Sequence, residues 1–442
     1  MTIRTRRILL GVAVAIFLAV GSVLLVYARG YRWDFSNNKF LLSGAIYVET
    51  MYPKETTITL NGKLNSQDGS ALMKSLLPTK KYKISVSKEN FQTWEKEFKI
   101  EPGLVTNTEN IVLFPKELKT QVVWPETTGL NDFTISTNEK NIAIKIGSAK
   151  VLLRDLTNIN ATSTELKFPD KLKTKTITFI ENNKSWSKDS QKLIVLRETT
   201  KLIKNWFIHD TTNNSFTNLT TLYEKKLVLK NPSHTPLPTK FLPTQLRWFG
   251  ENGIIALING KLFLIDIKEE KITDLNFSAI QGFDVFENKI IAIKNPNIIL
   301  MMDSAVQNIS ALGETKFENP TKIYFSPEAD KAVYSNGKNI AVIWLKETTK
   351  GQIKKVNDQE VIYTSSADVN EFIGTQIYWH HFGEYILFNE GQNFKTAEID
   401  TRSNINIASW PENKINKTVY LPKESKLYIL ENSTVKVIDG EF

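Results

Sequence analysis

Residues 379–388 read WHHFGEYILF and place two of the chain's four histidines, His380 and His381, beside a tryptophan and a carboxylate. Imidazole and carboxylate groups together can bind a metal ion or transfer protons. A metal site needs three or four ligands, however, and adjacent residues of an extended strand point to opposite faces. The other two histidines, His209 and His234, add no His-x-x-x-His spacing. We therefore predict no metal, catalytic or cofactor residues, and keep His380, His381 and His234 as candidate ligand-facing residues.

Other common catalytic patterns are missing from the sequence. The chain has no cysteine, which excludes thiolate metal sites and cysteine nucleophiles. It also has no phosphate-binding glycine loop and no glycine-flanked serine of the nucleophile-elbow type. Six aspartates end apolar runs, and their regular recurrence favours a role in starting the next turn over catalysis. They are Asp155, Asp210, Asp266, Asp303, Asp400 and Asp439.

The WHHFGEYILF stretch is one copy of an internal repeat. It aligns with FSPEADKAVY (325–334) and WSKDSQKLIV (186–195), each an aromatic residue, a polar turn and an apolar strand. Four weaker copies begin at residues 135, 248, 285 and 420. The seven copies recur roughly every 48 residues, which is typical of four-stranded propeller blades.

The repeated element resembles the W-S-P-D-G-K-x-I-A-F motif of TolB-like and related WD-type β-propellers. The resemblance implies a propeller of about seven blades over residues 118–442, and it says little about the ligand. We expect the repeat aromatics to pack between blades rather than to stack on sugars, and these are Trp186, Trp248, Phe325 and Trp379. The last copy ends three residues before the C-terminus, so LKTQVVW (118–124) is expected to supply its missing outer strand.

Two connections between the repeated strands are long. The first, residues 222–243, is proline-rich, contains His234 and is predicted to be a surface loop. Loops on a rigid scaffold often carry binding residues, which makes this segment a candidate partner contact, although a plain long connection is the more common case. The second, residues 346–366, is rich in lysine.

The N-terminal region contains an uncharged apolar run. Residues 8–28 form about 31 Å of helix, which matches the hydrocarbon thickness of a bilayer. The run is longer than the apolar core of a cleavable signal peptide, so we expect a transmembrane signal anchor, with cleavage after Ala28 as the alternative. Three arginines precede the run and two follow it, which favours a cytoplasmic tail at residues 1–7 and extracytoplasmic domains.

Residues 43–116 alternate apolar and polar residues, which predicts a small all-β domain. The expected strands lie near 44–53, 56–63, 81–88, 94–100 and 110–114, and Asn61-Gly62 predicts a hairpin turn. This stretch resembles a PEGA domain, a β-module of bacterial and archaeal cell-surface proteins. The matching residues are Gly44, Pro53, Asn61-Gly62, Leu77-Pro78, Tyr82, Phe91 and Gly103. It departs from the family pattern at 53–56, where PKET replaces Pro-Glu-Gly-Ala, at Lys80-Lys81 and at Asn90.

The charge distribution and the repeats together indicate a binding protein of the cell envelope. The chain has 56 basic and 47 acidic residues, interspersed beyond the N-terminus and without an arginine cluster, which argues against nucleic-acid binding. We expect an all-β, membrane-anchored and non-catalytic protein, without a cofactor, whose propeller binds a protein or a cell-wall glycan. The alternatives are a propeller hydrolase or lyase that acts on envelope polysaccharide, and a sensor that signals through a partner.

Overall fold

The computed structural model describes the chain in two compact units. The described residues are all those of the sequence other than 1, 53, 68–70, 79, 159–161, 171, 182, 230–239, 304–307, 350, 366–372, 411–414 and 439–442. The first unit comprises Met1–Phe114, Thr348–Ile353 and Asp400–Asn406, and the second comprises Pro115–Glu347, Lys354–Ile399 and Ile407–Phe442.

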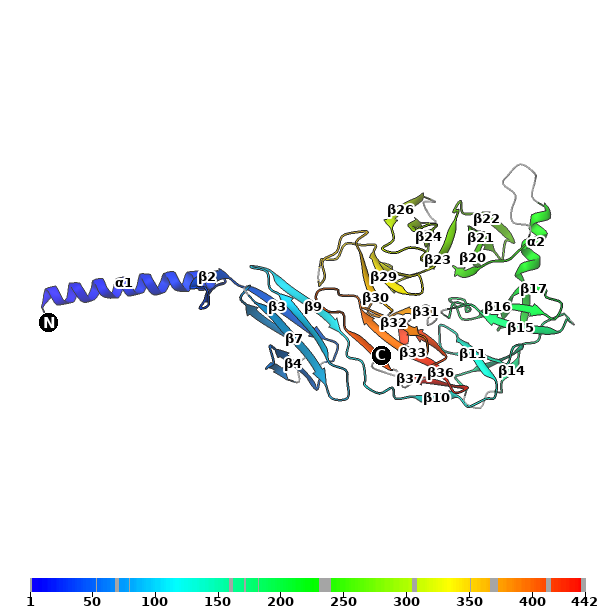
Figure 1. The fold of residues 1–442 in the computed structure, drawn as a ribbon, viewed down its shortest axis with the longest axis horizontal. Coiled ribbons are helices and arrows are strands. Elements are labelled where there is room, and N and C mark those ends of the chain that lie inside the picture. The colour runs from blue at the N-terminus through cyan, green and yellow to red at the C-terminus, as the bar shows by residue number, and fades with distance from the viewer. Residues whose placement is uncertain are drawn as a thin grey trace. The chain divides into compact units, whose positions relative to one another are not determined.

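The first unit begins with a long helix and a short hairpin (Figure 1). Helix α1 (Ile3–Ala28) buries none of its side chains and is long and apolar enough to cross a membrane, a test that a signal sequence also passes. The hairpin of β1 (Tyr31–Asp34) and β2 (Lys39–Leu42) follows at once. The guanidinium of Arg32 lies 3.7 Å from the centre of the Tyr27 ring and donates to the Tyr27 carbonyl, so the hairpin is tied to the end of the helix.

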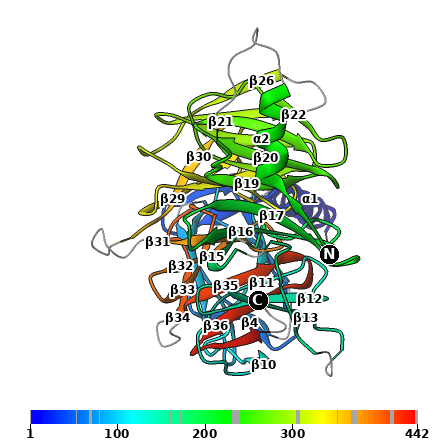
Figure 2. The same ribbon diagram turned by 90° about the vertical axis from the view of Figure 1, so that its right-hand side faces the viewer.

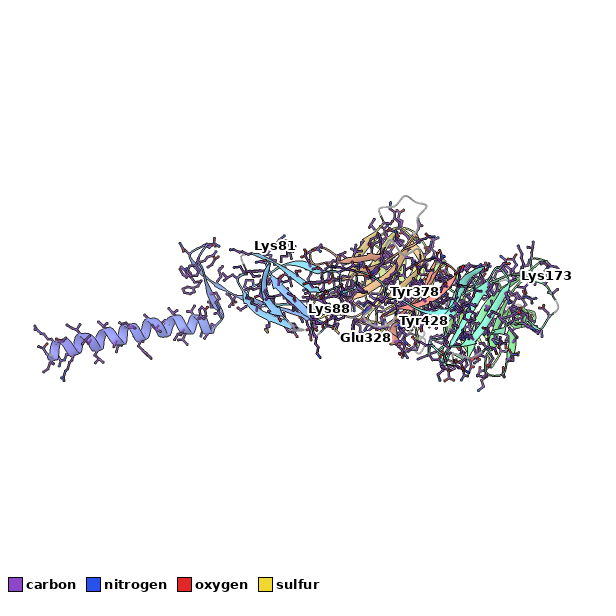
Figure 3. All side chains as sticks on the ribbon, turned by 90° about the horizontal axis from the view of Figure 1, so that it is seen from below. Lys81, Lys88, Lys173, Glu328, Tyr378 and Tyr428 are labelled. Carbon is purple, nitrogen blue, oxygen red and sulfur yellow. The ribbon has the colours of Figure 1, made fainter. Side chains whose placement is uncertain are left out.

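Two sheets with a shared core form the rest of the first unit. One has the order β6-β3-β9 and the other β5-β4-β7-β8. Their strands are β3 (Gly44–Thr50), β4 (Thr56–Leu60), β5 (Lys63–Gln67), β6 (Ala71–Leu76), β7 (Lys81–Lys88), β8 (Trp94–Lys99) and β9 (Val105–Ile111). Ile46 and Val48 of β3 pack against Ile84 and Trp94 of the opposite sheet, which makes a sandwich. Figure 3 labels Lys81 and Lys88, the two ends of β7.

The predicted Asn61-Gly62 hairpin is confirmed, because both residues have positive φ and join the paired strands β4 and β5. Two strands, β5 and β6, were not predicted. The last predicted strand, 110–114, was placed too late: β9 ends at Ile111 because it pairs in parallel with β3, a long-range pairing that local alternation does not reveal.

A buried ion pair fixes the segment Asp400–Asn406 within the first unit. The Lys96 ammonium is buried and contacts both the carbonyl and the carboxylate of Asp400. Arg402 donates to that carboxylate at 2.7 Å and to the Asn107 carbonyl at 2.8 Å. Burial raises the pKa of Asp400, but the hydrogen bond from Arg402 and the charges of Lys96 and Arg402 outweigh it and leave the pKa below its usual value.

The second unit is a β-propeller (Figure 1). Its described residues form seven four-stranded antiparallel sheets, each of four sequential strands except the last.

The first blade contains β11 (Leu130–Ile135), β12 (Asn141–Ile146), β13 (Lys150–Asp155) and β14 (Thr164–Glu165); the second contains β15 (Thr174–Phe179), β16 (Lys192–Thr199), β17 (Lys204–Asp210) and β18 (Ser215–Asn218). The third contains β19 (Gln245–Phe249), β20 (Gly253–Ile258), β21 (Lys261–Asp266) and β22 (Lys271–Asp274); the fourth contains β23 (Ile280–Phe286), β24 (Lys289–Lys294), β25 (Ile298–Asp303) and β26 (Asn308–Glu314). The fifth contains β27 (Lys322–Phe325), β28 (Lys331–Ser335), β29 (Asn339–Trp344) and β30 (Gln359–Thr364); the sixth contains β31 (Ile373–Trp379), β32 (Tyr385–Glu390), β33 (Asn393–Glu398) and β34 (Ile407–Trp410).

The seventh blade closes the ring in the predicted way. It contains β35 (Lys417–Leu421), β36 (Lys426–Glu431) and β37 (Thr434–Ile438), with a short 3-10 helix η1 (Pro422–Glu424) between the first two. Its outer strand is β10 (Gln121–Trp124), which pairs with β37. Residues of the seventh blade also share a core with Phe133 and Ile144 of the first blade, so the N-terminal strand and the C-terminal strands complete one ring.

The prediction of a surface loop at 222–243 was partly wrong. Helix α2 (Leu219–Leu229) occupies the start of this segment and lies against β17 and β22 (Figure 2). Leu222 and Tyr223 are buried in the core shared by the second and third blades. The prolines that suggested a loop come later, and residues 230–239, including His234, lie outside the described residues.

The aligned repeats share one turn between the first two strands of a blade. In the first, second and fifth blades Ser136, Ser187 and Ser326 each pair through the backbone with the residue five positions later. The serine hydroxyl accepts a second bond from that residue's N–H, at 2.8, 2.9 and 3.0 Å respectively. In the sixth blade His380 occupies the serine position with the same backbone pairing to Tyr385. The alignment from sequence is thereby confirmed for these four copies.

Candidate ligand site on the propeller axis

A cavity of about 260 Å³ lies where the innermost strands of several blades end. Its lining residues come from the fourth to seventh blades, from the first blade and from a segment of the second. They are Thr137, Asn183, Lys184, Asp284, Val285, Phe286, Tyr324, Phe325, Ser326, Pro327, Ile377, Tyr378, Trp379, Tyr420, Leu421 and Pro422. Because inner strands of a propeller surround its axis, this cavity is axial.

Aromatic side chains form one wall of the cavity. Tyr324, Tyr378 and Tyr420 each lie one residue before the end of an inner strand, in the fifth, sixth and seventh blades, and all three are buried. The Tyr378 hydroxyl, on the strand labelled β31 in Figure 1, donates to the Thr418 carbonyl at 2.7 Å, and Figure 3 labels this residue. Burial raises the pKa of Tyr420 to about 12, so its hydroxyl stays protonated at neutral pH. The wall is therefore uncharged and held by hydrogen bonds.

A segment of the second blade, which we call the floor, contributes Asn183 and Lys184 to the lining of the cavity. Glu181 and residues 183–185 lie between β15 and Trp186, the residue that aligns with Phe325 and Trp379. The Asn183 side chain forms two hydrogen bonds with Ile135 of the first blade. Its Oδ1 accepts the Ile135 N–H at 2.9 Å, and its Nδ2 donates to the Ile135 carbonyl at 2.7 Å. Glu181 reaches Lys322 of the fifth blade at 3.6 Å, and Lys184 reaches Asp284 of the fourth at 3.4 Å. The second blade is not a sequence neighbour of the fourth or fifth, so these ion pairs cross the axis.

Asp284 is the electrostatic centre of the floor. One of its carboxylate oxygens, Oδ1, lies 3.3 Å from Arg247 Nε and 3.4 Å from Lys184 Nζ. The other, Oδ2, accepts the backbone N–H of Phe325 at 3.1 Å. Arg247 and Asp284 are buried, whereas the Lys184 side chain is 37 % exposed. Two cations thus share one carboxylate, and only Lys184 of the two lines the cavity.

The two adjacent histidines lie in the turn that leads away from this cavity. His380 is fully buried, and His381 is partly buried with its Nδ1 at 2.8 Å from Ser425 Oγ and 3.2 Å from the Tyr420 hydroxyl. Their ring centres are 4.2 Å apart, so the turn places them on the same side, unlike neighbours in a strand. Burial lowers the pKa of His381. Neither histidine lines the cavity, but Tyr420, which contacts His381, does.

The predicted packing aromatics are buried or half-buried. Trp186, Phe325 and Trp379 are buried, and Trp248 is half-buried. The indole N–H of Trp379 donates to the Tyr324 carbonyl at 3.1 Å, and that of Trp248 donates to the Ser185 carbonyl at 3.1 Å. Each of these two hydrogen bonds joins a blade to the preceding one, so the Trp248 and Trp379 side chains link neighbouring blades.

The turn role predicted for the repeated aspartates is confirmed for four of them. Asp155, Asp210, Asp266 and Asp400 each accept the backbone N–H two residues later at 2.8 or 2.9 Å. Asp303 instead accepts from the Asn288 amide, and Asp439 lies outside the described residues. Among the described residues no group of three or more histidine, aspartate or glutamate side chains is arranged to hold a metal ion.

Of the residues that line the cavity, Phe325 and Trp379 were singled out from the sequence, but Lys184, Asp284 and the three tyrosines were not. Signals for them were present, because the stretch 181–185 is extra with respect to the repeat, and a tyrosine precedes the repeat aromatic in the copies that begin at Phe325 and Trp379. The extra stretch departs from the repeat, and the tyrosine is an addition to the residues that the repeat needs for packing. They become meaningful once the ring brings the strand ends together.

Comparisons with known proteins identify no family for this chain. No protein-family model matches the chain, and no curated protein matches it. Among solved structures, the β-propeller domain of Cps50 (Swd1) from Myceliophteria thermophila matches 72 % of this chain and 99 % of its own length, with 10 % identity and a TM-score of 0.47. This match carries no argument about function, and the assignment of a seven-bladed propeller rests on the strand order described above.

Proposed function

We propose that this protein is a membrane-tethered, non-catalytic binding protein whose propeller holds a protein partner at the axial cavity. The observation that carries the proposal is the composition of the cavity: a wall of buried aromatic rings with a single partly exposed cation, Lys184, on its floor. Apolar walls with a few placed polar groups are typical of binding sites. The cell-wall glycan remains the second class of ligand.

The tether is supported by the hairpin that follows α1. Phe35 at its tip is 86 % exposed, and Tyr31, Trp33 and Phe40 are also exposed. Aromatic residues next to a spanning helix are typical of the membrane interface, where lipid headgroups cover them. This pattern favours a retained anchor over a cleaved signal sequence, with residues 1–7 in the cytoplasm and the β-domains outside.

The tether can be tested with a single spin label because the chain has no cysteine. In lipid nanodiscs, a label at Phe35→Cys should be accessible to oxygen and shielded from a water-soluble nickel complex. A label at Leu202→Cys, an exposed position in the second blade, should show the opposite. A label at position 35 with the same nickel accessibility as one at position 202 would contradict a hairpin at the interface.

The sandwich between Gly44 and Phe114 is proposed to be a PEGA-like module that separates the propeller from the membrane. The support is the sequence resemblance together with the Asn61-Gly62 turn and the left-handed φ of Asn90, where the family pattern has glycine. A spacer needs a stable core and no catalytic set. The shared core of its two sheets meets the first requirement.

We propose binding in place of catalysis because too few of the described carboxylates line the cavity for a glycosidase mechanism. Among the described lining residues Asp284 is the one acidic side chain, whereas glycosidases use two. Both of its oxygens already accept from protein groups. The alternative, a hydrolase or lyase for envelope polysaccharide, would be supported by the release of reducing ends from such a polysaccharide by the purified full chain.

Filling the cavity tests the proposal. Val285 lines the cavity and is half-buried, so Val285→Trp should occupy it and abolish retention of envelope proteins by the full chain in nanodiscs. Val361→Trp is the matched control, because Val361 lies in the outer strand β30 and is 39 % exposed. Unchanged thermal unfolding of both variants shows that they fold. Retention of the same partner by folded Val285→Trp would refute the axial site.

A further inference from the structure

The floor of the axial cavity is held rigidly by several blades. Asn183 is buried and bonds the first blade, and Glu181 pairs with Lys322 of the fifth. The Ser185 carbonyl accepts from Ile194 of its own blade and from Trp248 of the third. Lys184 therefore projects from a fixed segment. Little conformational freedom of the backbone would be lost when a ligand binds.

The charges on this floor favour an anionic ligand group. Arg247 and Lys184 both face the Asp284 carboxylate, so the cluster carries one uncompensated positive charge. The Asp284 oxygens are occupied, as described above, and could accept a ligand donor only by losing a protein partner. An ammonium has three donors, and the ion pair with Asp284 uses one of them. Lys184 can therefore donate to an acceptor in the cavity.

The size of the cavity selects a small group. At about 260 Å³ it is below the roughly 300–1,000 Å³ of typical small-molecule sites, so it suits one chain end with one apolar side chain. Phe286, Phe325 and Trp379 line it together with the tyrosine wall, and this surface suits a ring or a branched aliphatic group. The carboxyl terminus of a polypeptide carries a carboxylate and an apolar side chain on the same residue.

We infer that the axial cavity binds the carboxyl terminus of a partner polypeptide, with Lys184 contacting the terminal carboxylate and the aromatic wall taking the last side chain. This inference rests on the proposed function and adds the chemistry of the ligand to it. Specificity follows because an amide or an internal peptide bond offers no charge to Lys184, whereas a charge-assisted bond is stronger than a neutral one.

The test compares two small probes on the full chain in nanodiscs. N-acetyl-L-phenylalanine carries the carboxylate, and N-acetyl-L-phenylalaninamide lacks it. Binding measured by ligand-observed NMR titration should be about tenfold tighter for the acid, as expected for one charged hydrogen bond. Lys184→Met should remove the difference and Lys184→Arg should keep it. Lys188→Met, at an exposed neighbouring position, should leave the preference unchanged.

Each other outcome overturns the inference. Equal affinity for acid and amide, no binding of either, or a preference that survives Lys184→Met would refute the role of Lys184. Binding of glucuronic acid but not of N-acetyl-L-phenylalanine would assign the cavity to acidic sugars instead. These results are separable from the proposed function, because loss of the partner in Val285→Trp would still stand if the acid preference failed.

Discussion

The inner strands of the second and fifth blades end in different ways. In the fifth blade β27 ends at Phe325 and is followed directly by the turn of Ser326. In the second blade an excursion that includes Glu181 and residues 183–185 separates β15 from Trp186 and the equivalent turn of Ser187. The turn is the same, but the excursion crosses the axis and pairs with the fourth and fifth blades.

This difference distinguishes the residues that build the propeller from those that form the candidate ligand site. The regular copies satisfy the backbone and pack the blades, which is what a repeat requires for stability. The irregular copy adds the Lys184 ammonium beside Asp284, which belongs to the inner strand of a regular copy. In this propeller, the departure from the repeat supplies the group that can select a ligand.

The largest expected effect comes from breaking the buried pair under the floor. Arg247→Met should lower the free energy of unfolding by about 3 kcal/mol, because the buried Asp284 side chain would lose one of its two cationic partners. Lys184→Met, at a side chain that is 37 % exposed, should cost about 1 kcal/mol or less. Urea unfolding of the full chain in detergent measures both. Equal losses would show that the floor is not organised around Arg247.

The shared turn gives a smaller effect that should be the same in both blades. Ser187→Ala and Ser326→Ala each remove a buried hydroxyl that accepts a backbone N–H, and each should cost about 1 kcal/mol. The same unfolding experiment applies. If only one of the two substitutions is costly, the equivalence of the two turns is wrong.

The smallest effect is a pH dependence of stability. Burial lowers the pKa of His381 and of His209 below the ordinary value of 6.5, so the folded state binds the proton less readily than the unfolded chain. Stability is therefore full above pH 6.5 and falls as the pH drops from there towards the folded pKa values. His381→Asn should reduce the slope between pH 7.5 and 5 in thermal unfolding. An unchanged slope would mean that His381 does not contribute to it.

The sequence was sufficient for the parts of the molecule that repeat or alternate. Residue periodicity located the blades and the closing strand within 118–124, because packing imposes similar residues at each copy. It could not locate the cavity, because Lys184 and Asp284 are about a hundred residues apart and meet only across the axis. Helix α2 was missed because the prolines after it dominated the local signal.

The most direct test of the central claim is site-specific photo-crosslinking in native membranes. Phe286, which lines the cavity, would be replaced by a benzoyl-phenylalanine, and Phe216 in the outer strand β18 would be replaced in the same way as a control. We expect a covalent adduct with one protein from position 286, the loss of this adduct when Val285→Trp is added, and no such adduct from position 216. The same adduct from both positions, or one that persists with the cavity filled, would contradict an axial binding site.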